Sequence, residues 1–138
     1  FVGICLGLQL LFDRSEEFGD YSGLGLIKGK VKKFKLYSHN STKYPVPQIG
    51  WNKIKRMDAS WEDSLLCNNT NDDFMYFVHS YFVEPENDNI MLSKTTYGNT
   101  EYCSSIQQNN IFACQFHPEK SGEIGINIYK NLKKEYCS

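Results

Sequence analysis

Three side chains near the two ends of the chain could act together as a nucleophile, a base and an orienting acid. Cys5 is the centre of a Gly-Ile-Cys-Leu-Gly motif at residues 3–7, and His117 precedes Glu119 by two positions. A thiol becomes a strong nucleophile when a base removes its proton, and a histidine base needs a third group that fixes its ring. These residue types predict covalent catalysis by a cysteine.

The elements expected around Cys5 would hold it at a sharp turn. Residues 1–4 favour the end of a buried strand, and the leucines of residues 6–13 favour a helix. A glycine-flanked nucleophile between a strand and a helix forms a nucleophile elbow, whose central backbone is strained and whose glycines relieve crowding. The positive end of the helix would lower the thiol pKa and direct the Leu6 N–H at an oxyanion. The alternative is a buried structural cysteine in a tight turn.

Of the three histidines, His117 is the best candidate for the base. It follows an apolar run that favours a strand, and the proline after it keeps it out of a helix. If Glu119 also stays extended, both side chains lie on one face of the chain, so the carboxylate can accept a hydrogen bond from the ring. His79 lies in an aromatic strand, where a structural role is the alternative, and His39 lies in a polar loop.

The rest of the chain predicts an α/β domain with a mixed sheet. Alternating and apolar runs favour six further strands, at residues 31–37, 51–56, 74–83, 90–95, 101–108 and 111–116. A short helix is expected at residues 61–66. A final helix is expected after Ser121, which could cap it, because apolar residues recur every four positions from Ile124 to Tyr136.

Length, charge and cysteine count exclude several other classes of protein. The 138 residues make one domain or part of one, and 15 basic against 16 acidic residues give a net charge of -1, too weak a field for nucleic acid or an anionic membrane. No apolar run approaches the roughly 20 residues of a membrane span. The five cysteines include no Cys-x-x-Cys pair, so we expect free thiols and no zinc, other metal or organic cofactor.

Four separate motifs resemble those of a known family. Residues 3–9 (GICLGLQ) and 115–121 (QFHPEKS) look like the two signatures of class I (triad-type) glutamine amidotransferases. Residues 46–52 (VPQIGWN) and 76–81 (YFVHSY) are similar to segments of one branch, the glutaminase subunits of imidazole glycerol phosphate synthase, of histidine biosynthesis. The resemblance covers essentially the whole chain.

The resemblance implies a fold, a reaction and a set of binding residues. The fold would be a flavodoxin-like open α/β sheet with helices on both faces. Cys5, His117 and Glu119 would form a triad that hydrolyses glutamine to glutamate and ammonia through a glutamyl thioester, with the Leu6 N–H in the oxyanion hole. The residues implied to bind glutamine are Gln9, Glu17, His79, Ser80 and Tyr81. Those implied to face a partner are Pro47, Gln48, Ile49, Gly50 and Trp51.

The resemblance also implies that the chain works with a second protein. In this branch the ammonia passes through a protein channel to a cyclase (synthase) subunit, so a cytoplasmic heterodimer is implied, with glutamine as substrate and no metal or cofactor. Relatives in the branch normally have histidine at the position of Gln48. The residue at this position therefore bears on how the chain would couple to its partner.

The family's domain normally begins well upstream of the elbow. Several strand–helix units precede the nucleophile there, including a glycine-rich loop that supplies a second oxyanion-hole amide. We therefore expect residues 1–138 to be the C-terminal two-thirds of a single amidotransferase domain. We also expect the isolated chain to be inactive, because loss of one oxyanion donor slows such reactions by about 10²–10³-fold.

Two alternatives remain open at the level of sequence. The same glutaminase chemistry could supply a sugar amidotransferase of surface-polysaccharide biosynthesis, which Gln48 would fit as part of a diverged interface. The chain could also be a non-catalytic docking fragment, with the lysines of residues 28–35 as a docking stripe or, as charge patterns more often indicate, a solvated strand face. The intact set of Cys5, His117 and Glu119 argues against a non-catalytic role.

Overall fold

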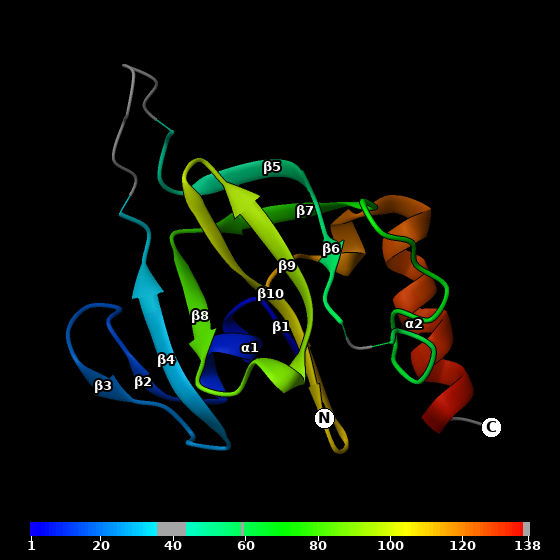
Figure 1. Ribbon diagram of the computed structural model, residues 1–138, viewed down its shortest axis with the longest axis horizontal. Helices are drawn as coiled ribbons and strands as arrows, with labels where there is room; N and C mark the ends of the chain where they lie inside the picture. The colour runs from blue at the N-terminus through cyan, green and yellow to red at the C-terminus, as the bar shows by residue number, and fades with distance from the viewer. Residues whose placement is uncertain (36–43, 59, 137–138) are drawn as a thin grey trace.

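The computed structural model describes residues 1–35, 44–58 and 60–136, and its strands form one large and one small sheet (Figure 1). The large sheet contains β1 (Val2–Ile4), β2 (Phe12–Ser15), β3 (Tyr21–Ser22), β4 (Ile27–Lys33), β6 (Lys55–Arg56), β8 (Tyr81–Pro85), β9 (Met91–Tyr97), β10 (Thr100–Gln108) and β11 (Ile111–Cys114). The small sheet pairs β5 (Gln48–Lys53) with β7 (Phe74–His79). The helices are α1 (Leu6–Leu10) and α2 (Gly122–Tyr136), with 3-10 turns η1 (Asp88–Ile90) and η2 (Pro118–Lys120).

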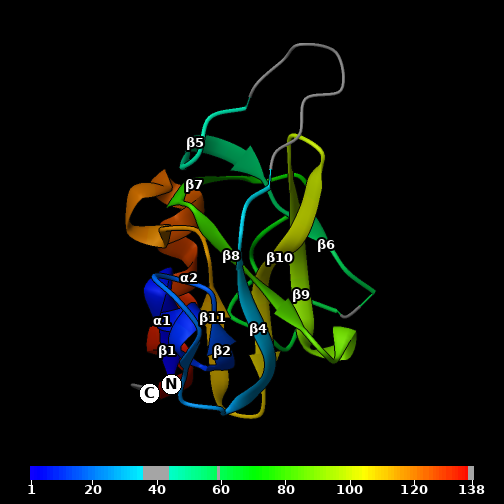
Figure 2. The ribbon, with the colours of Figure 1, turned by 90° about the vertical axis from the view of Figure 1, so that its left-hand side faces the viewer.

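The large sheet is open and mixed. Its strand order is β1-β11-β10-β8-β4-β2-β3, and β9 pairs with β10 and β6. Parallel pairs form between β1 and β11 and between β2 and β4, whereas the remaining pairs are antiparallel. The two perpendicular views show the sheet curling, with β5 and β7 across one end (Figures 1 and 2). The predicted α/β class with an open sheet is confirmed, and most of the strand pairs are antiparallel.

One helix packs on each face of the sheet beside β11, as the resemblance implied. Successive side chains of β11 point to opposite faces, because side chains alternate along a strand. Ala113 packs in one buried cluster with Leu8 of α1. Its neighbour Cys114 packs in the other cluster with Ile128 of α2, which lies along the side of the molecule (Figure 1). The nucleophile turn and the terminal helix therefore flank the same strand from opposite sides.

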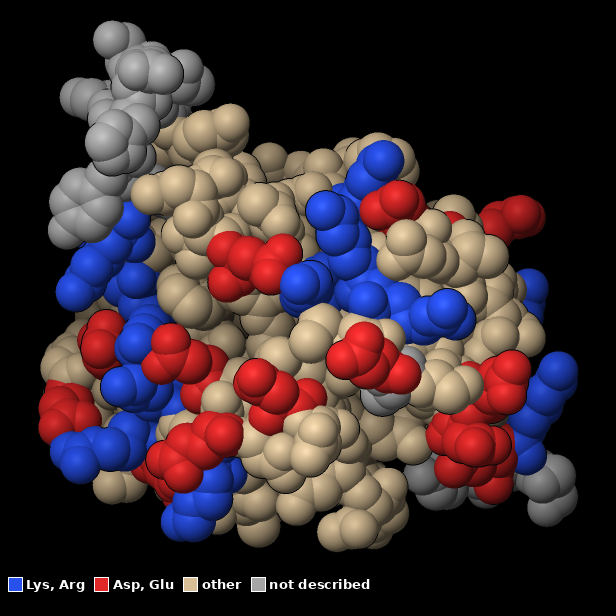
Figure 3. Space-filling model, viewed as in Figure 1, with Lys and Arg blue, Asp and Glu red and all other residues tan. Residues whose placement is uncertain are grey.

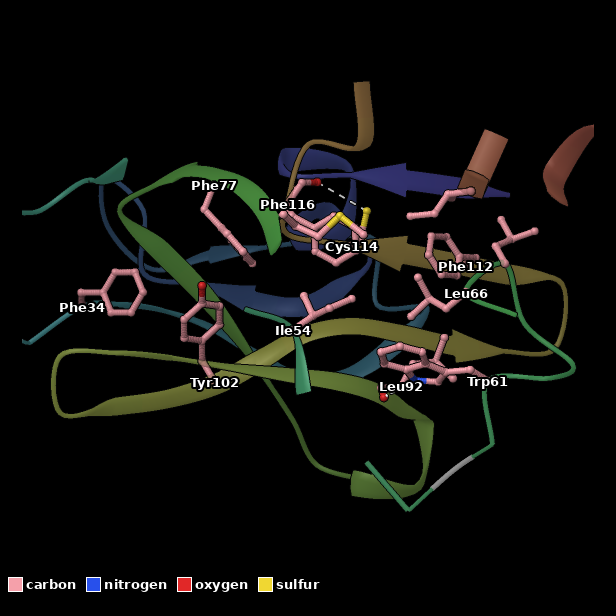
Figure 4. Packing of buried hydrophobic residues seen from close by; sticks show 13 residues of the cluster. Phe34, Ile54, Trp61, Leu66, Phe77, Leu92, Tyr102, Phe112, Cys114 and Phe116 are labelled. Atoms are coloured by element: carbon pink, nitrogen blue, oxygen red, sulfur yellow. Dashed lines mark hydrogen bonds between the residues drawn. The ribbon is translucent and has the colours of Figure 1, made fainter. Parts of the chain in front are cut away.

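An aromatic cluster fills the space between the large sheet, the small sheet and α2 (Figure 4). Phe77 of β7 packs edge-on against Phe116, with ring centroids 5.8 Å apart. Cys114 lies within this cluster, and its sulfur is 3.4 Å from the Phe116 carbonyl oxygen. Burial raises the pKa of the Cys114 thiol well above its ordinary value. Cys114 is therefore a buried thiol that packs within the core.

Four predicted elements were wrong, and the first is the strand expected at residues 51–56, which is β5 of the small sheet followed by β6 of the large sheet. The helix expected at residues 6–13 ends at Leu10, because Phe12 is fully buried and pairs with Ile27 in a parallel ladder. Residues 61–66 form turns in place of a helix, and the Trp61 indole N–H donates to the Leu92 carbonyl at 2.7 Å. The strand expected at residues 74–83 is two strands in different sheets.

The structure does not test two further sequence predictions. The loop with His39 and the end of the strand expected at 31–37 lie outside the described residues. The expectation that residues 1–138 are two-thirds of a domain stays a prediction. Within residues 1–35, 44–58 and 60–136, no helix has the length and apolar character that crossing a membrane requires.

Candidate active site

The turn at Cys5 has the strained backbone expected of a nucleophile elbow. Cys5 has φ 52° and ψ -104°, a region that non-glycine residues rarely adopt. Its N–H donates to the Cys114 carbonyl at 2.7 Å, and its own carbonyl accepts from the Leu8 N–H at 3.1 Å. These bonds tie the turn to β11 on one side and to α1 on the other. Strain held in this way is typical of functional sites.

The two glycines of the motif have different roles. A Cβ at Gly3 would lie 2.9 Å from the backbone carbon and oxygen of Gly7, so only glycine lets α1 approach β1 this closely. A Cβ at Gly7 would meet nothing within 4 Å. The prediction that glycines relieve crowding is therefore right for Gly3 and wrong for Gly7.

The pKa of the Cys5 thiol is raised, which corrects the expectation that the helix end lowers it. Burial is the main cause, and the Glu119 and Glu17 carboxylates raise the pKa further. The Leu6 backbone N–H and the Gln115 side chain oppose this shift as hydrogen-bond donors. The helix has only five residues, so its partial positive charge does not outweigh desolvation. Cys5 is therefore a protonated thiol at neutral pH and needs a base.

His117 and Glu119 are in hydrogen-bond contact after the end of β11. His117 Nδ1 lies 2.6 Å from Glu119 Oε1. The prediction that Glu119 stays extended was wrong. Glu119 lies in the 3-10 turn η2, which brings its carboxylate back to the His117 ring. The Ser121 hydroxyl does not cap α2 either. It donates to the His117 carbonyl at 2.6 Å and accepts from the Tyr76 N–H at 3.0 Å, so it anchors η2 to β7.

The second ring nitrogen of His117 is buried and has no hydrogen-bond partner among the described residues. The Cys5 sulfur does not reach it. The thiol lies 3.9 Å from the Val78 carbonyl oxygen and 3.6 Å from Gln115 Nε2. Hydrogen bonds between catalytic groups are often long in ligand-free proteins and tighten when substrate binds. The free His117 nitrogen is thus available for proton transfer, while Val78 and Gln115 hold the thiol.

A cavity of about 450 Å³ opens beside Cys5. All five residues that the resemblance implied for glutamine binding line it together with Cys5 and Leu6: Gln9, Glu17, His79, Ser80 and Tyr81. Ser80 lies at the break between β7 and β8, so the junction of the two strands forms part of the cavity wall. The cavity also includes Phe18, Lys33 and Val78, which sequence analysis did not assign.

His79 and Gln9 are held by hydrogen bonds within the protein. His79 Nδ1 donates to the Tyr81 carbonyl oxygen at 2.7 Å, and its Nε2 lies 3.2 Å from the Tyr102 hydroxyl. Burial lowers the pKa of His79 to about 4, so its ring is neutral. Gln9 Nε2 donates to the same Tyr81 carbonyl at 3.0 Å. Both side chains therefore fix the Tyr81 backbone at the cavity wall.

The segment implied to face a partner divides into an inner and an outer side. The Gln48 side chain is only 2% exposed, and its oxygen accepts from the Tyr102 hydroxyl at 2.9 Å. Gln48 therefore does not present its side chain to a partner. Ile49 and Trp51 point outward, with 62% and 55% of their surfaces exposed. Pro47 is also exposed, and Gly50 has a positive φ of 131°.

Sequence analysis missed Lys33 and Gln115 as members of the site. The charge pattern indicates Lys33 as one of several surface lysines, yet it lines the cavity with its ammonium 6.0 Å from the Tyr81 ring centroid. Gln115 lies within the second motif, two residues before His117, and that position was the available signal. No group of three or more metal-binding side chains occurs in the described parts of the chain.

Comparison with known families agrees with this fold. The chain belongs to the family of class I glutamine amidotransferases, whose model matches residues 1–133. Solved structures of low sequence identity share the fold. A putative GMP synthase protein from Thermoplasma acidophilum has a TM-score of 0.58 at 19% identity, covering 94% of this chain and 53% of its own. The glutaminase domain of Trypanosoma brucei CTPS, with bound acivicin, has a TM-score of 0.57 at 15% identity, covering 96% and 60%.

Within the family, the chain is similar to curated proteins named as subunits of imidazole glycerol phosphate synthase. The chain is 44% identical to the imidazole glycerol phosphate synthase subunit HisH of Chlorobium chlorochromatii, over 95% of this chain and 61% of the relative. It is 47% identical to the protein of the same name from Methanocaldococcus jannaschii, over 96% and 62%. The chain therefore spans about 61% of the length of the curated relatives it matches.

Proposed function

We propose that the chain carries the glutaminase site of an imidazole glycerol phosphate synthase and hydrolyses glutamine to glutamate and ammonia. One observation supports this most strongly. The strained turn at Cys5 and the His117–Glu119 pair follow the same ends of the parallel strands β1 and β11, whose residues Ile4 and Cys114 are paired. Sites of open α/β sheets lie at such carboxyl ends.

The geometry supports a thioester mechanism. The Cys5 sulfur attacks the side-chain amide carbon of glutamine while its proton moves to His117 Nε2. Glu119 holds the opposite nitrogen and stabilises the cationic ring. The Leu6 N–H stabilises the oxyanion of the tetrahedral intermediate. His117 returns the proton to the nitrogen that leaves as ammonia, and water then hydrolyses the thioester to glutamate and a free thiol.

The cavity suits a zwitterionic amino acid. One acidic and one basic side chain line it, Glu17 and Lys33, so it can pair with an α-ammonium and an α-carboxylate at once. The Ser80 and Tyr81 backbone passes along the same wall and is held by His79 and Gln9. We propose that these contacts orient glutamine with its side-chain amide toward Cys5.

We propose that the outer side of β5 contacts the synthase partner in a cytoplasmic heterodimer. Trp51 packs edge-on against Tyr76 with ring centroids 6.0 Å apart, and the Lys120 ammonium lies 5.8 Å from the Tyr76 centroid. Lys120 directly follows Glu119, so a partner on this surface would be adjacent to the triad. The rim over β5 is largely uncharged, whereas both signs of charge are interspersed below it (Figure 3). Exposed aromatic side chains of this kind are enriched at protein interfaces.

The histidine-pathway assignment is supported by the names of the relatives. The alternative of a sugar amidotransferase as acceptor used Gln48 as part of a diverged interface, and the burial of the Gln48 side chain weakens that argument. The expectation that residues 1–138 alone are inactive remains a prediction of this proposal.

Glutamate release from glutamine tests the proposal. We would measure the full-length gene product with and without the cyclase subunit, beside Cys5→Ala and a control, Cys67→Ala, which removes an exposed free thiol. We expect cyclase-stimulated release that disappears in Cys5→Ala and persists in Cys67→Ala. Release that needs Cys5 but ignores the cyclase would indicate another synthase. Absence of release from every protein would contradict the glutaminase assignment.

A further inference from the structure

We propose that Gln115 is a further catalytic residue, whose side-chain N–H donates to the Cys5 sulfur and stabilises the thiolate as it forms. The proposal rests on the proposed function in taking Cys5 as the nucleophile. Gln115 Nε2 lies 3.6 Å from Cys5 Sγ, which is within the range of hydrogen bonds to sulfur. Gln115 is therefore in direct contact with the reacting atom.

The orientation of the Gln115 amide follows from counting hydrogens. Gln9 Nε2 has two hydrogens, and it donates to the Tyr81 carbonyl at 3.0 Å and to Gln115 Oε1 at 3.1 Å. Because the Gln115 oxygen is held by a donor, its NH₂ group must face the other way, toward Cys5. A reversed amide would place two NH₂ groups against each other and an oxygen against the thiolate.

Burial makes this arrangement rigid. Gln115 has no exposed surface and Gln9 is 8% exposed, so water does not compete for either amide. The Gln115 backbone N–H donates to the Ser104 carbonyl at 2.9 Å, which fixes the main chain as well. The Tyr81 carbonyl, which accepts from Gln9, also accepts from His79 Nδ1 at 2.7 Å. The donor aimed at Cys5 is thus prepositioned and needs no reorganisation when the thiolate forms.

The other groups around Cys5 show why such a donor matters. Glu119 of η2 and Glu17 after β2 place negative charge near the sulfur, and the Val78 carbonyl of β7 accepts from the neutral thiol but repels a thiolate. Lys33 of β4 lines the same cavity, and the His117 ring follows β11. Two groups donate directly to the sulfur among the described residues, the Leu6 N–H and the Gln115 amide.

The pH dependence of Cys5 alkylation tests the proposal without requiring turnover. We would measure the rate of iodoacetamide modification of Cys5 in the full-length gene product from pH 6 to 10, with no glutamine present. Gln115→Met keeps the length of the side chain and removes the donor. We expect the midpoint of the rate-against-pH curve to move upward by about one pH unit. The alkylation rate near neutral pH would then fall about tenfold. Gln115→Glu should shift it further in the same direction.

Matched controls separate this role from packing. Gln107→Met removes an exposed amide that donates to the Asp63 carbonyl at 2.9 Å, and it should leave the Cys5 titration unchanged. Gln9→Met keeps Gln115 but removes the hydrogen bond that holds its side-chain oxygen. This variant should shift the Cys5 titration less than Gln115→Met does. Unchanged Cys5 titration in folded Gln115→Met would overturn the proposal.

A measurement on the unaltered protein keeps the test open if Gln115→Met does not fold. The side-chain NH₂ resonances of Gln115 should move with pH in step with the Cys5 titration. Resonances that stay fixed through that titration would refute a hydrogen bond to the thiolate. Because neither readout requires glutamine hydrolysis, failure of the glutaminase assignment would leave both results interpretable.

Discussion

Glu119 Oε1 lies 2.6 Å from His117 Nδ1, and this contact leaves His117 Nε2 buried and unpaired among the described residues on the other side of the ring. The carboxylate therefore selects the tautomer in which Nε2 carries no proton, which the proposed proton transfer from Cys5 requires. Glu119→Gln keeps the shape of the side chain but removes its charge. We expect kcat for glutamate release to fall roughly 10²–10⁴-fold with little change in KM, because Glu119 orients the base and does not line the substrate cavity.

The matched control for Glu119 is Glu123→Gln. Glu123 is an exposed carboxylate in the first turn of α2. It should retain activity within about twofold, because surface substitutions away from special features change stability little. Equal kinetics for Glu119→Gln and the unaltered protein would remove Glu119 from the mechanism.

The two glycines of the elbow should respond differently to alanine. Gly3→Ala would press a methyl group against the Gly7 backbone 2.9 Å away, and we expect it to lower the free energy of unfolding by about 1–3 kcal/mol. Gly7→Ala meets open space within α1 and should be neutral or stabilise by up to about 1 kcal/mol. Urea titrations of both variants provide the comparison, and similar losses would contradict the close approach of α1 to β1.

His79 should make stability depend on pH. Its pKa is about 4 in the folded protein, against 6.5 in an unfolded chain, because burial disfavours the charged ring and the nearby His117 adds to the effect. Between pH 4 and pH 6.5, His79 is protonated in the unfolded state and neutral in the folded state. The free energy of unfolding should therefore fall as pH is lowered from 6.5 to 4, by about 3 kcal/mol from this residue.

Denaturant titrations across this pH range isolate the His79 contribution. Carboxylates also titrate in this pH range. The informative quantity is therefore the difference in the free energy of unfolding between the unaltered protein and His79→Gln. That difference should shrink steadily as pH falls from 6.5 to 4. A difference that is constant with pH would mean that His79 titrates normally in the folded protein.

Ser121 should contribute to both stability and the position of His117. Ser121→Ala removes the acceptor of the Tyr76 N–H and the donor to the His117 carbonyl, and we expect it to lower the free energy of unfolding by about 1–3 kcal/mol. Ser60→Ala removes only an exposed bond to the Glu62 N–H and should change stability by less than about 0.5 kcal/mol. Thermal unfolding of the two variants checks this prediction, which equal midpoints would contradict.

The parts of the site that are local in sequence were predictable. Cys5 lies within its glycine motif, and His117 lies two residues from Glu119, so short-range rules sufficed to select them. The break at Ser80 was not predictable from residues 74–83, because β7 pairs with β5 whereas β8 pairs with β4 and β10. Tertiary pairing decided against the continuous apolar strand that propensity favours.

Roles that depend on burial required the structure. A rise in the Cys5 pKa results from packing around the turn, which outweighs the short helix. Gln48 belongs to a segment whose outer residues are exposed, and only its strand register places its own side chain under Tyr102. Contacts between residues about a hundred positions apart, such as Gln9 with Gln115, have no local signature.

The most direct test of the central claim is covalent labelling by 6-diazo-5-oxo-norleucine, an electrophilic analogue of glutamine. The protein with its cyclase partner would be treated with the analogue, digested, and each cysteine peptide quantified by mass spectrometry. We predict stoichiometric modification of Cys5, protection by glutamine, and loss of glutamate release in proportion to labelling. Labelling of the exposed Cys67 with Cys5 unmodified, or no protection by glutamine, would contradict Cys5 as the glutaminase nucleophile.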